Sequence, residues 1–134
     1  MFDIGREYHR RSEIYGEFGG QEQGGISTPA KHPYIFIFSG DSGEKYGYKD
    51  GWFDTERYRY TGQGQRGDME FRAGNLAIRD HSENDKEIHL FEKTRKSYYR
   101  YEGQLKYIDH ELVERVPDAD HRLRTAIVFM LRRV

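Results

Sequence analysis

One run of residues constrains the fold more than any other part of this sequence. It reads Tyr34-Ile-Phe-Ile-Phe38, and it lies between Pro33 and the pair Ser39-Gly40. Five consecutive β-branched and aromatic residues between turn-forming residues are typical of a strand that is buried on both faces. We therefore expect residues 34–38 to form the centre of the hydrophobic core.

A longer strand is predicted by the alternation of residues 99–107. Tyr99, Tyr101, Leu105 and Tyr107 share one face of an extended chain, and charged or amide side chains occupy most of the other. This period of two predicts a half-buried strand. Two further strands are expected, over residues 87–93 and 125–131.

Helical and irregular segments complete the expected topology. Residues 1–30 are polar and rich in glycine, which indicates irregular structure with one short helix around residues 7–15. Apolar residues recur at helical spacing over residues 69–81, and residues 116–120 have the composition of a turn. Because no repeat or linker interrupts the chain, we expect residues 1–134 to form a single α+β, mainly β domain, a curved sheet or barrel with one or two flanking helices.

The composition disfavours several classes of protein. No apolar run approaches 18 residues and the N-terminus lacks a signal-peptide pattern, so neither membrane insertion nor secretion is favoured. The chain has no cysteine, which removes thiolate chemistry and fits a cytoplasmic location. Its 22 basic and 23 acidic side chains give a net charge of −1, which argues against a protein that binds nucleic acid through bulk charge.

Histidines and carboxylates offer candidates for metal binding or catalysis. His81 and His89 flank a polar segment, but a solvated loop is favoured there over a metal-binding nuclease motif. Residues 109–111, Asp-His-Glu, are expected at a strand end facing water. Asp50, Asp54 and Asp68 stay open as paired catalytic carboxylates, because a sequence does not give the distances between them.

Two tyrosine-bearing segments could form opposite walls of a slot. They read Tyr48-Lys-Asp-Gly51 and Tyr60-Thr-Gly-Gln-Gly64. An extruded nucleobase fits such a slot, since rings stack on its faces and a carboxylate accepts a hydrogen bond from its exocyclic amine. From the residues alone, tyrosines at the edge of the core are the favoured interpretation.

The same two segments resemble the SRA family (SET and RING-associated, also called YDG), in which a Tyr-x-Asp segment precedes Tyr-Thr-Gly-x-Gly at about this interval. The similarity covers most of the chain, and it is closest to bacterial proteins in which such a domain precedes an HNH nuclease domain in modification-dependent restriction enzymes. The further matching segments are Gln23-Gly-Gly-Ile-Ser27, Asp68, Gly74-Asn-Leu-Ala-Ile78, Tyr101-Glu-Gly103 and Phe129-Met-Leu-Arg-Arg133.

The resemblance implies an SRA-like, PUA-like barrel that binds duplex DNA and flips a modified cytosine into a pocket. Tyr48 and Tyr60 would sandwich the base, Asp50 would read its Watson–Crick edge, and Thr61 and Gly62 would line the wall through backbone groups. We expect a preference for 5-methylcytosine with 5-hydroxymethylcytosine tolerated, because an apolar pocket rejects an added hydroxyl only weakly.

The resemblance also implies a role inside a larger, nucleoid-associated protein. This fragment would bind DNA with no catalysis, cofactor or metal of its own, and a C-terminal HNH nuclease domain in cis would cut. A homodimer of the full-length protein is part of this expectation. Two alternatives stay open: a hydrolase acting on a base or sugar through Asp50 or Asp68, and an RNA-binding PUA-like barrel.

Contacts to DNA phosphates must come from local basic residues, because the net charge is near zero. The candidates are Lys31, Arg66, Arg72, Lys96 and Arg100. Arg66 is the strongest of them, since it lies in the glycine-rich segment beside the expected pocket. For each, a solvated side chain balanced by nearby acids is the alternative.

Overall fold

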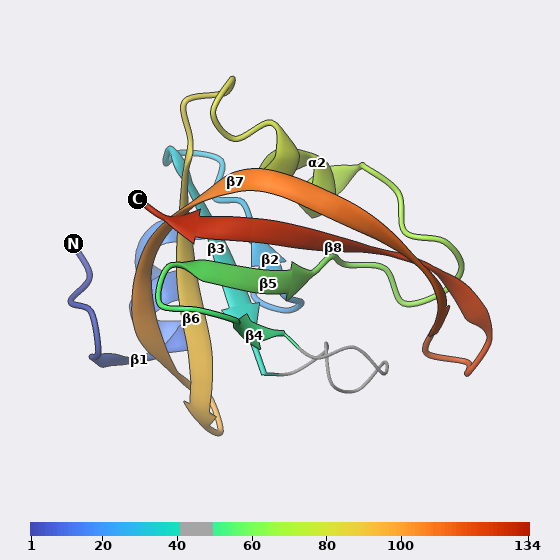
Figure 1. The fold of residues 1–134 in the computed structure, drawn as a ribbon. Coiled ribbons are helices and arrows are strands. Elements are labelled where there is room, and N and C mark those ends of the chain that lie inside the picture. The colour runs from blue at the N-terminus through green and yellow to red at the C-terminus, as the bar shows by residue number, and fades with distance from the viewer. Residues whose placement is uncertain (41–49) are drawn as a thin grey trace.

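The computed structural model describes residues 1–40 and 50–134, whose eight strands form one curved sheet (Figure 1). The strands are β1 (Glu7–His9), β2 (Ile26–Ser27), β3 (Tyr34–Ser39), β4 (Gly51–Trp52), β5 (Arg57–Thr61), β6 (Glu87–Arg95), β7 (Tyr98–Pro117) and β8 (Leu123–Arg133). The helical segments are the π-helix η1 (Arg10–Tyr15) and the α-helices α1 (Gly16–Phe18) and α2 (Ala73–Arg79). The expectation of a mainly β, α+β fold is confirmed.

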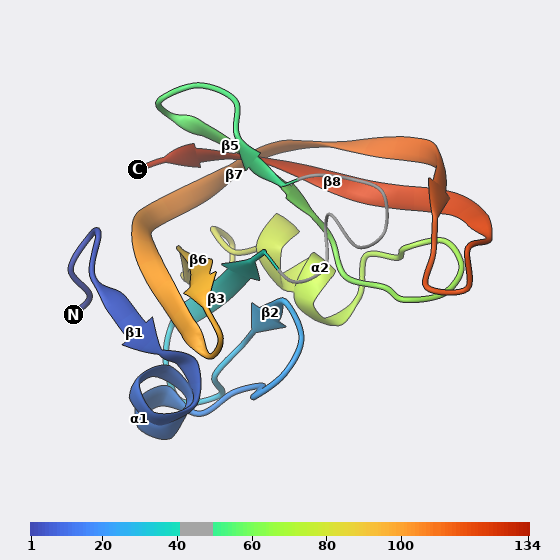
Figure 2. The same ribbon diagram turned by 90° about the horizontal axis from the view of Figure 1, so that it is seen from below.

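The strand order creates an interior that α2 fills. The order is β2-β3-β6-β7-β8-β5-β4, with β1 paired to β7. Only β3 and β6 run parallel among the described pairs, and the crossover between them contains β4, β5 and α2. Figure 2 shows α2 between the arm formed by β2, β3 and β6 and the arm formed by β5, β7 and β8.

The curvature comes from β7, which belongs to both arms. Its first part pairs with β6 and its later part with β8. At the bend, Gly103 opposes Leu90 while Tyr101 opposes Phe91, so that Glu102 is an extra residue in β7. Gly103 has a φ of 116°, which a glycine adopts without a Cβ clash, and the bulge bends the strand. The motif Tyr101-Glu-Gly103 therefore has a structural role.

Two expected helices differ from the structure. Over residues 69–81 only Ala73–Arg79 is helical, because the Met69 N–H donates to the Thr125 carbonyl (3.0 Å) and its sulfur accepts from the Ile127 N–H (3.2 Å). These bonds hold Met69 against β8 and outside the helix. Over residues 7–15 the chain first pairs with β7 as β1, and only then forms η1.

The predicted strands are present, but some of them begin or end at other residues than expected. Residues 34–38 form β3, and residues 125–131 lie within β8. The strand expected over residues 99–107 continues to Pro117, so residues 109–111 lie within β7 rather than at a strand end, and the turn begins later than expected. None of the described helices has the length and apolar character needed to cross a membrane.

Candidate functional site

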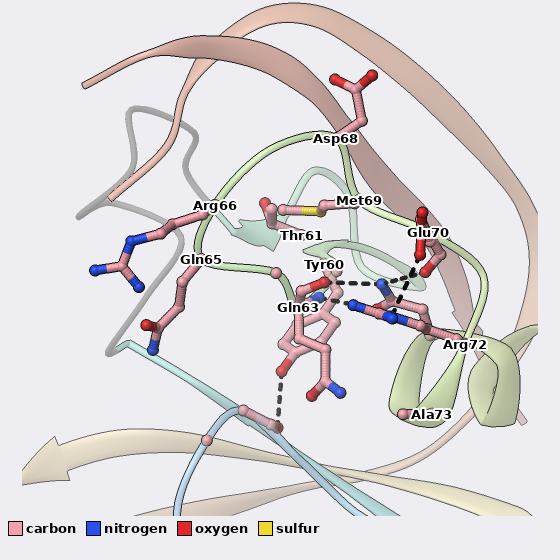
Figure 3. A pocket seen from close by; sticks show the side chains of 15 residues that line it. Tyr60, Thr61, Gln63, Gln65, Arg66, Asp68, Met69, Glu70, Arg72 and Ala73 are labelled. Carbon is pink, nitrogen blue, oxygen red and sulfur yellow. Dashed lines mark hydrogen bonds and ion pairs between the residues drawn. The ribbon is translucent and has the colours of Figure 1, made fainter. Parts of the chain in front are cut away.

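A pocket of about 580 Å³ opens where the chain leaves β5 for α2 (Figure 3). Its walls come from the Gly24-Gly25 pair, from the end of β5, from the following loop and from the start of α2. The volume is in the range of sites that enclose small ligands. The pocket therefore brings Tyr60, Thr61 and Gly62, three of the expected site residues, to one place.

Tyr60 is a fixed wall of this pocket. The side chain lies at the pocket (Figure 3) and is 2% exposed. Its hydroxyl lies 2.8 Å from the Gly25 carbonyl and 3.1 Å from the Phe38 carbonyl. Burial and the nearby Asp50 raise the pKa of the Tyr60 hydroxyl well above its ordinary value, so it remains a donor. Tyr60 is thus also part of the hydrophobic core, which agrees with the interpretation of these tyrosines as residues at the edge of the core.

Thr61 presents an unsatisfied polar atom beside Tyr60. Its N–H donates to Asp50 Oδ1 (2.7 Å), but its buried Oγ1 has no hydrogen-bond partner in the described part of the chain. A buried hydroxyl without a partner costs about 1–3 kcal/mol. A ligand with a polar edge would satisfy an atom of this kind.

Asp50 is held beside the pocket by groups from two strands. Oδ1 accepts from Thr61, and Oδ2 lies 3.5 Å from the Ser39 hydroxyl at the end of β3. The Tyr58 hydroxyl lies 2.7 Å from Ser39 Oγ and 3.1 Å from Glu92 Oε2. A chain of polar contacts therefore crosses the sheet from Asp50 to Glu92.

This chain ends at Glu92, whose carboxyl group interacts with that of Glu102. Burial, followed by the hydrogen bond and charge of Glu102, raises the pKa of Glu92 to about 7. Burial also acts on Glu102, but hydrogen bonds from Arg100, Glu92 and Trp52 hold its pKa below the usual value. Glu92 consequently keeps its proton to a higher pH than an ordinary carboxyl group, while Glu102 keeps its charge.

Asn75 of α2 organises the loop that forms the pocket floor. It is 1% exposed, its Oδ1 accepts from the Gln63 N–H (2.9 Å), and its Nδ2 donates to the Gln63 and Glu70 carbonyls (2.9 and 3.0 Å). Gly62 donates its N–H to the Ile127 carbonyl (2.8 Å), and a Cβ there would approach Asn75 Oδ1 to 2.8 Å. The N–H groups of Thr61 and Gly62 therefore serve the fold.

The expected phosphate-binding residues are distributed over several places. Arg66 and Arg72 line the pocket, where they pair with Asp120 (2.9 Å) and Glu70 (3.3 Å). Arg100 instead pairs with Glu102 (2.9 Å) and lies 3.7 Å from Glu92. Lys31 is exposed between β2 and β3, and Lys96 lines a second hollow in the turn after β6.

Tyr48 lies outside the described residues, so its place as the opposite wall stays a prediction. Sequence reasoning did not assign Gly25, Met69 or Asn75 to the pocket, although Gly25 and Asn75 occur in segments that match the family. Met69 was assigned to a helix because its spacing fits one. Only the contacts across the fold bring these residues together.

The remaining candidates for chemistry have structural partners. Asp68 Oδ1 accepts from the Thr125 N–H (2.7 Å). His81 and His89 are buried, and His89 Nδ1 lies 2.7 Å from the Tyr101 hydroxyl. Burial lowers the pKa of His89, which favours its neutral form. Within the described residues there is no group of three side chains that could hold a metal ion.

The curved sheet and the polar-walled pocket at the end of β5 define a small, mainly β binding domain. The family model for the SRA domain of ScoMcrA-like proteins matches residues 4–134, so the chain belongs to the SRA domain family. No curated protein matches the chain.

Solved SRA domains have the same fold. The sulfur-binding and SRA domains of ScoMcrA, complexed with phosphorothioated DNA, match with a TM-score of 0.78 at 22% identity, over 100% of this chain and 40% of that chain. The phosphorothioation-dependent restriction endonuclease ScoMcrA matches at 24% identity with a TM-score of 0.78, over 100% of this chain and 28% of that chain. The SUVH5 SRA domain, complexed with hemimethylated CG DNA, matches at 22% identity with a TM-score of 0.71, over 99% and 89%. This chain thus spans less than half of the ScoMcrA chains.

Proposed function

We propose that this SRA domain binds duplex DNA that contains a modified cytosine and takes that base into the pocket at the end of β5. The observation that carries the proposal is the unpartnered Oγ1 of Thr61, buried in a pocket wall between Tyr60 and Asp50. Structural neighbours in complex with methylated and hydroxymethylated DNA support it.

The pocket offers one group for each part of a cytosine. The Tyr60 ring provides an aromatic wall, Thr61 Oγ1 a hydroxyl for the polar edge, and Asp50 a carboxylate near the exocyclic amine, with Tyr48 proposed as the second ring. Extruding a base costs a few kcal/mol, and stacking on an aromatic side chain returns about 1–3 kcal/mol per contact. Two rings are therefore sufficient to offset the cost of flipping.

Recognition of the modification is a preference rather than a strict choice. One buried methyl contributes about 1 kcal/mol, and an added hydroxyl is rejected only weakly by an apolar surface. We expect 5-methylcytosine to bind more tightly than cytosine, and 5-hydroxymethylcytosine to bind nearly as well.

The domain would act as the specificity module of a larger modification-dependent HNH restriction endonuclease. The ScoMcrA chains, which are much longer than this one, include a restriction endonuclease, and this supports the proposal. Binding would be the task of this domain, and cleavage that of a nuclease domain in cis, in a protein that acts at the nucleoid and could dimerise.

The test is titration of three duplexes that differ in a single cytosine substituent, with the wild type and the Thr61→Val variant. Because valine removes an unpartnered buried hydroxyl, the free variant should be as stable as the wild type or about 1 kcal/mol more stable. Its affinity for the 5-methylcytosine duplex should fall by roughly tenfold, the value of one lost hydrogen bond.

Thr55→Val is the matched control, because Thr55 is exposed in the loop before β5, at the opposite end of that strand from Thr61. It should leave both stability and affinity unchanged. Equal affinities of the wild type for modified and unmodified duplexes would overturn the proposed function. Clear destabilisation of free Thr61→Val would show that the hydroxyl serves the fold instead.

A further inference from the structure

A second hollow, of about 300 Å³, lies between the start of η1 and the turn that joins β6 to β7. Its described lining includes four cations, Arg10, Arg11, Lys93 and Lys96, and one carboxylate, Glu22. The residues come from three separate segments of the chain. The concentration of positive charge is notable in a protein whose net charge is −1.

Arg10 is held rigidly in this hollow. Its guanidinium lies 3.8 Å from the centre of the buried Phe38 ring, and its Nη2 donates to the Gly24 carbonyl (2.7 Å). Its backbone N–H donates to the Ser97 carbonyl (2.9 Å), which ties η1 to the β6–β7 turn. A guanidinium fixed on an aromatic ring loses little entropy when it binds an anion.

Among the described lining residues, the cations outnumber the carboxylates. Arg11 pairs with Glu22 at 2.8 Å, which accounts for the single carboxylate in the described lining. Lys96 is exposed and has no ion-pair partner among residues 1–40 and 50–134. An open, cationic hollow with a serine at its edge suits a phosphate group.

This basic hollow is joined to the pocket at the end of β5, the base pocket, through two neighbouring glycines. Arg10 donates to the Gly24 carbonyl, and the Tyr60 hydroxyl donates to the Gly25 carbonyl. Gly24 and Gly25 line the base pocket, while Glu22 and Gln23 line the hollow. An anion that fixes Arg10 would therefore also fix one wall of the base pocket.

We propose that the hollow formed by Arg10, Lys93 and Lys96 binds a backbone phosphate of the DNA whose base enters the pocket, and that Arg10 links the two sites. This inference deepens the proposed function and rests on it. The phosphate provides affinity and fixes the position of the duplex, whereas the pocket provides the choice of base.

The first experiment measures the salt dependence of binding to an unmodified duplex, which requires no base flipping. Lys96→Ala should weaken binding about three- to fivefold at low salt, as expected for an exposed ion pair. It should also reduce the slope of log K against log salt by about one, because one fewer counterion is released. Lys106→Ala, which removes an exposed lysine from β7, is the matched control and should change neither value.

The second experiment uses a 5-methylcytosine duplex in which single phosphates are replaced in turn by uncharged methylphosphonates. For the wild type, one position near the modified base should reduce affinity about three- to fivefold. Lys96→Ala should lose less affinity than the wild type when that phosphate is replaced, because only Arg10 and Lys93 then contact it, and Lys96→Arg should restore the full sensitivity.

The outcomes separate the two proposals. An unchanged salt slope for Lys96→Ala, or an equal loss for Lys106→Ala, would overturn the phosphate site whatever the fate of the base pocket. Equal affinities for modified and unmodified duplexes, with a reduced salt slope for Lys96→Ala, would overturn the base pocket and retain the phosphate site.

Discussion

The two sides of β3 are covered by two hydrophobic cores of different composition. Ile35 and Ile37 face a mainly aliphatic core that also contains Ile78 of α2, whereas Phe36 and Phe38 face a mainly aromatic core packed against the N-terminal segment. Neighbouring residues of β6 divide in the same way, with Leu90 on the aliphatic side and Phe91 on the aromatic side.

Each core lies behind one of the two hollows. Tyr60 and Met69 belong to the aliphatic core and line the base pocket. Phe38 and Tyr99 belong to the aromatic core, and Arg10 stacks on Phe38 beside the basic hollow. In this domain the aromatic core holds a cation at its surface, while the aliphatic core leaves a pocket whose polarity comes from a few placed groups.

The largest effect is expected from breaking the aromatic core at Phe91. This residue is fully buried and contacts five rings, among them Phe2 at 5.0 Å and Tyr101 at 5.2 Å. Phe91→Ala should lower the free energy of unfolding by about 3–5 kcal/mol in denaturant titrations. Phe91→Leu should recover only part of this, because the edge-to-face contacts between rings are lost.

The matched change on the aliphatic side is Leu90→Met, since Leu90 is equally buried. A volume-conserving swap of this kind should cost less than about 1.5 kcal/mol. If Leu90→Met destabilised the domain as much as Phe91→Leu, the two cores would not differ in the geometry that they require.

A smaller effect on stability is expected from Gly25→Ala, because Gly25 lies between the base pocket and the basic hollow. A Cβ at Gly25 would lie 2.6 Å from the Tyr60 hydroxyl and 3.6 Å from the Phe38 carbonyl. The tyrosine must shift, and we expect a loss of about 1–3 kcal/mol of stability, typical of overpacking. Affinity for the modified duplex should fall with it, as measured by the same titrations.

Gly67→Ala tests a glycine of the loop between β5 and α2 that has open space around its Cβ position, although its φ of 72° adds backbone strain. It should reduce stability by about 1 kcal/mol through that strain alone. Equal losses of DNA affinity in the two variants would argue that contact between Gly25 and Tyr60 is not what shapes the pocket.

The smallest effect on stability is expected from the raised pKa of Glu92. Because the pKa of Glu92 is raised to about 7 in the folded protein and is lower in the unfolded chain, the folded state binds more protons between these values. Stability should therefore decrease as the pH rises from about 4.5 to 7. Glu92→Gln should remove this dependence and raise stability at pH 8 by about 1 kcal/mol, after allowance for solvent screening.

Unfolding of both proteins across pH 4–9 is the measurement. Arg100 lies beside both carboxyl groups and moderates the effect, so Glu102→Gln serves as the comparison. A pH profile of Glu92→Gln identical to that of the wild type would show that Glu92 is ionised throughout.

Much of the fold was predictable because its strongest signals are local. The apolar run at residues 34–38 and the alternation at residues 99–105 form strands with the expected buried positions. The continuation of β7 to Pro117 was not predictable, because its outer part exposes apolar residues such as Ile108 and Leu112 and has no period of two. There the strand is defined by its pairing with β8.

The candidate site was predictable to a similar degree. The segment Tyr60-Thr-Gly62 indicated a pocket wall, and these three residues line the pocket. The motif did not show that Tyr60 would be 2% exposed or that its hydroxyl would bind the Gly25 carbonyl, 35 residues away. Such contacts depend on strand order, which local periodicity does not encode.

The sequence by itself determined that β3 would be buried on both faces and that tyrosines and glycines would surround the loop after β5. A period of two assigns Ile35 and Phe36 to opposite faces, but it does not say which element covers each face. Only the tertiary structure decided that α2 covers the isoleucines, that the N-terminal segment covers the phenylalanines, and that Arg10 comes to rest on Phe38. The physical reason is that burial and charge pairing act between segments distant in sequence, and the crossover between β3 and β6 brings those segments together.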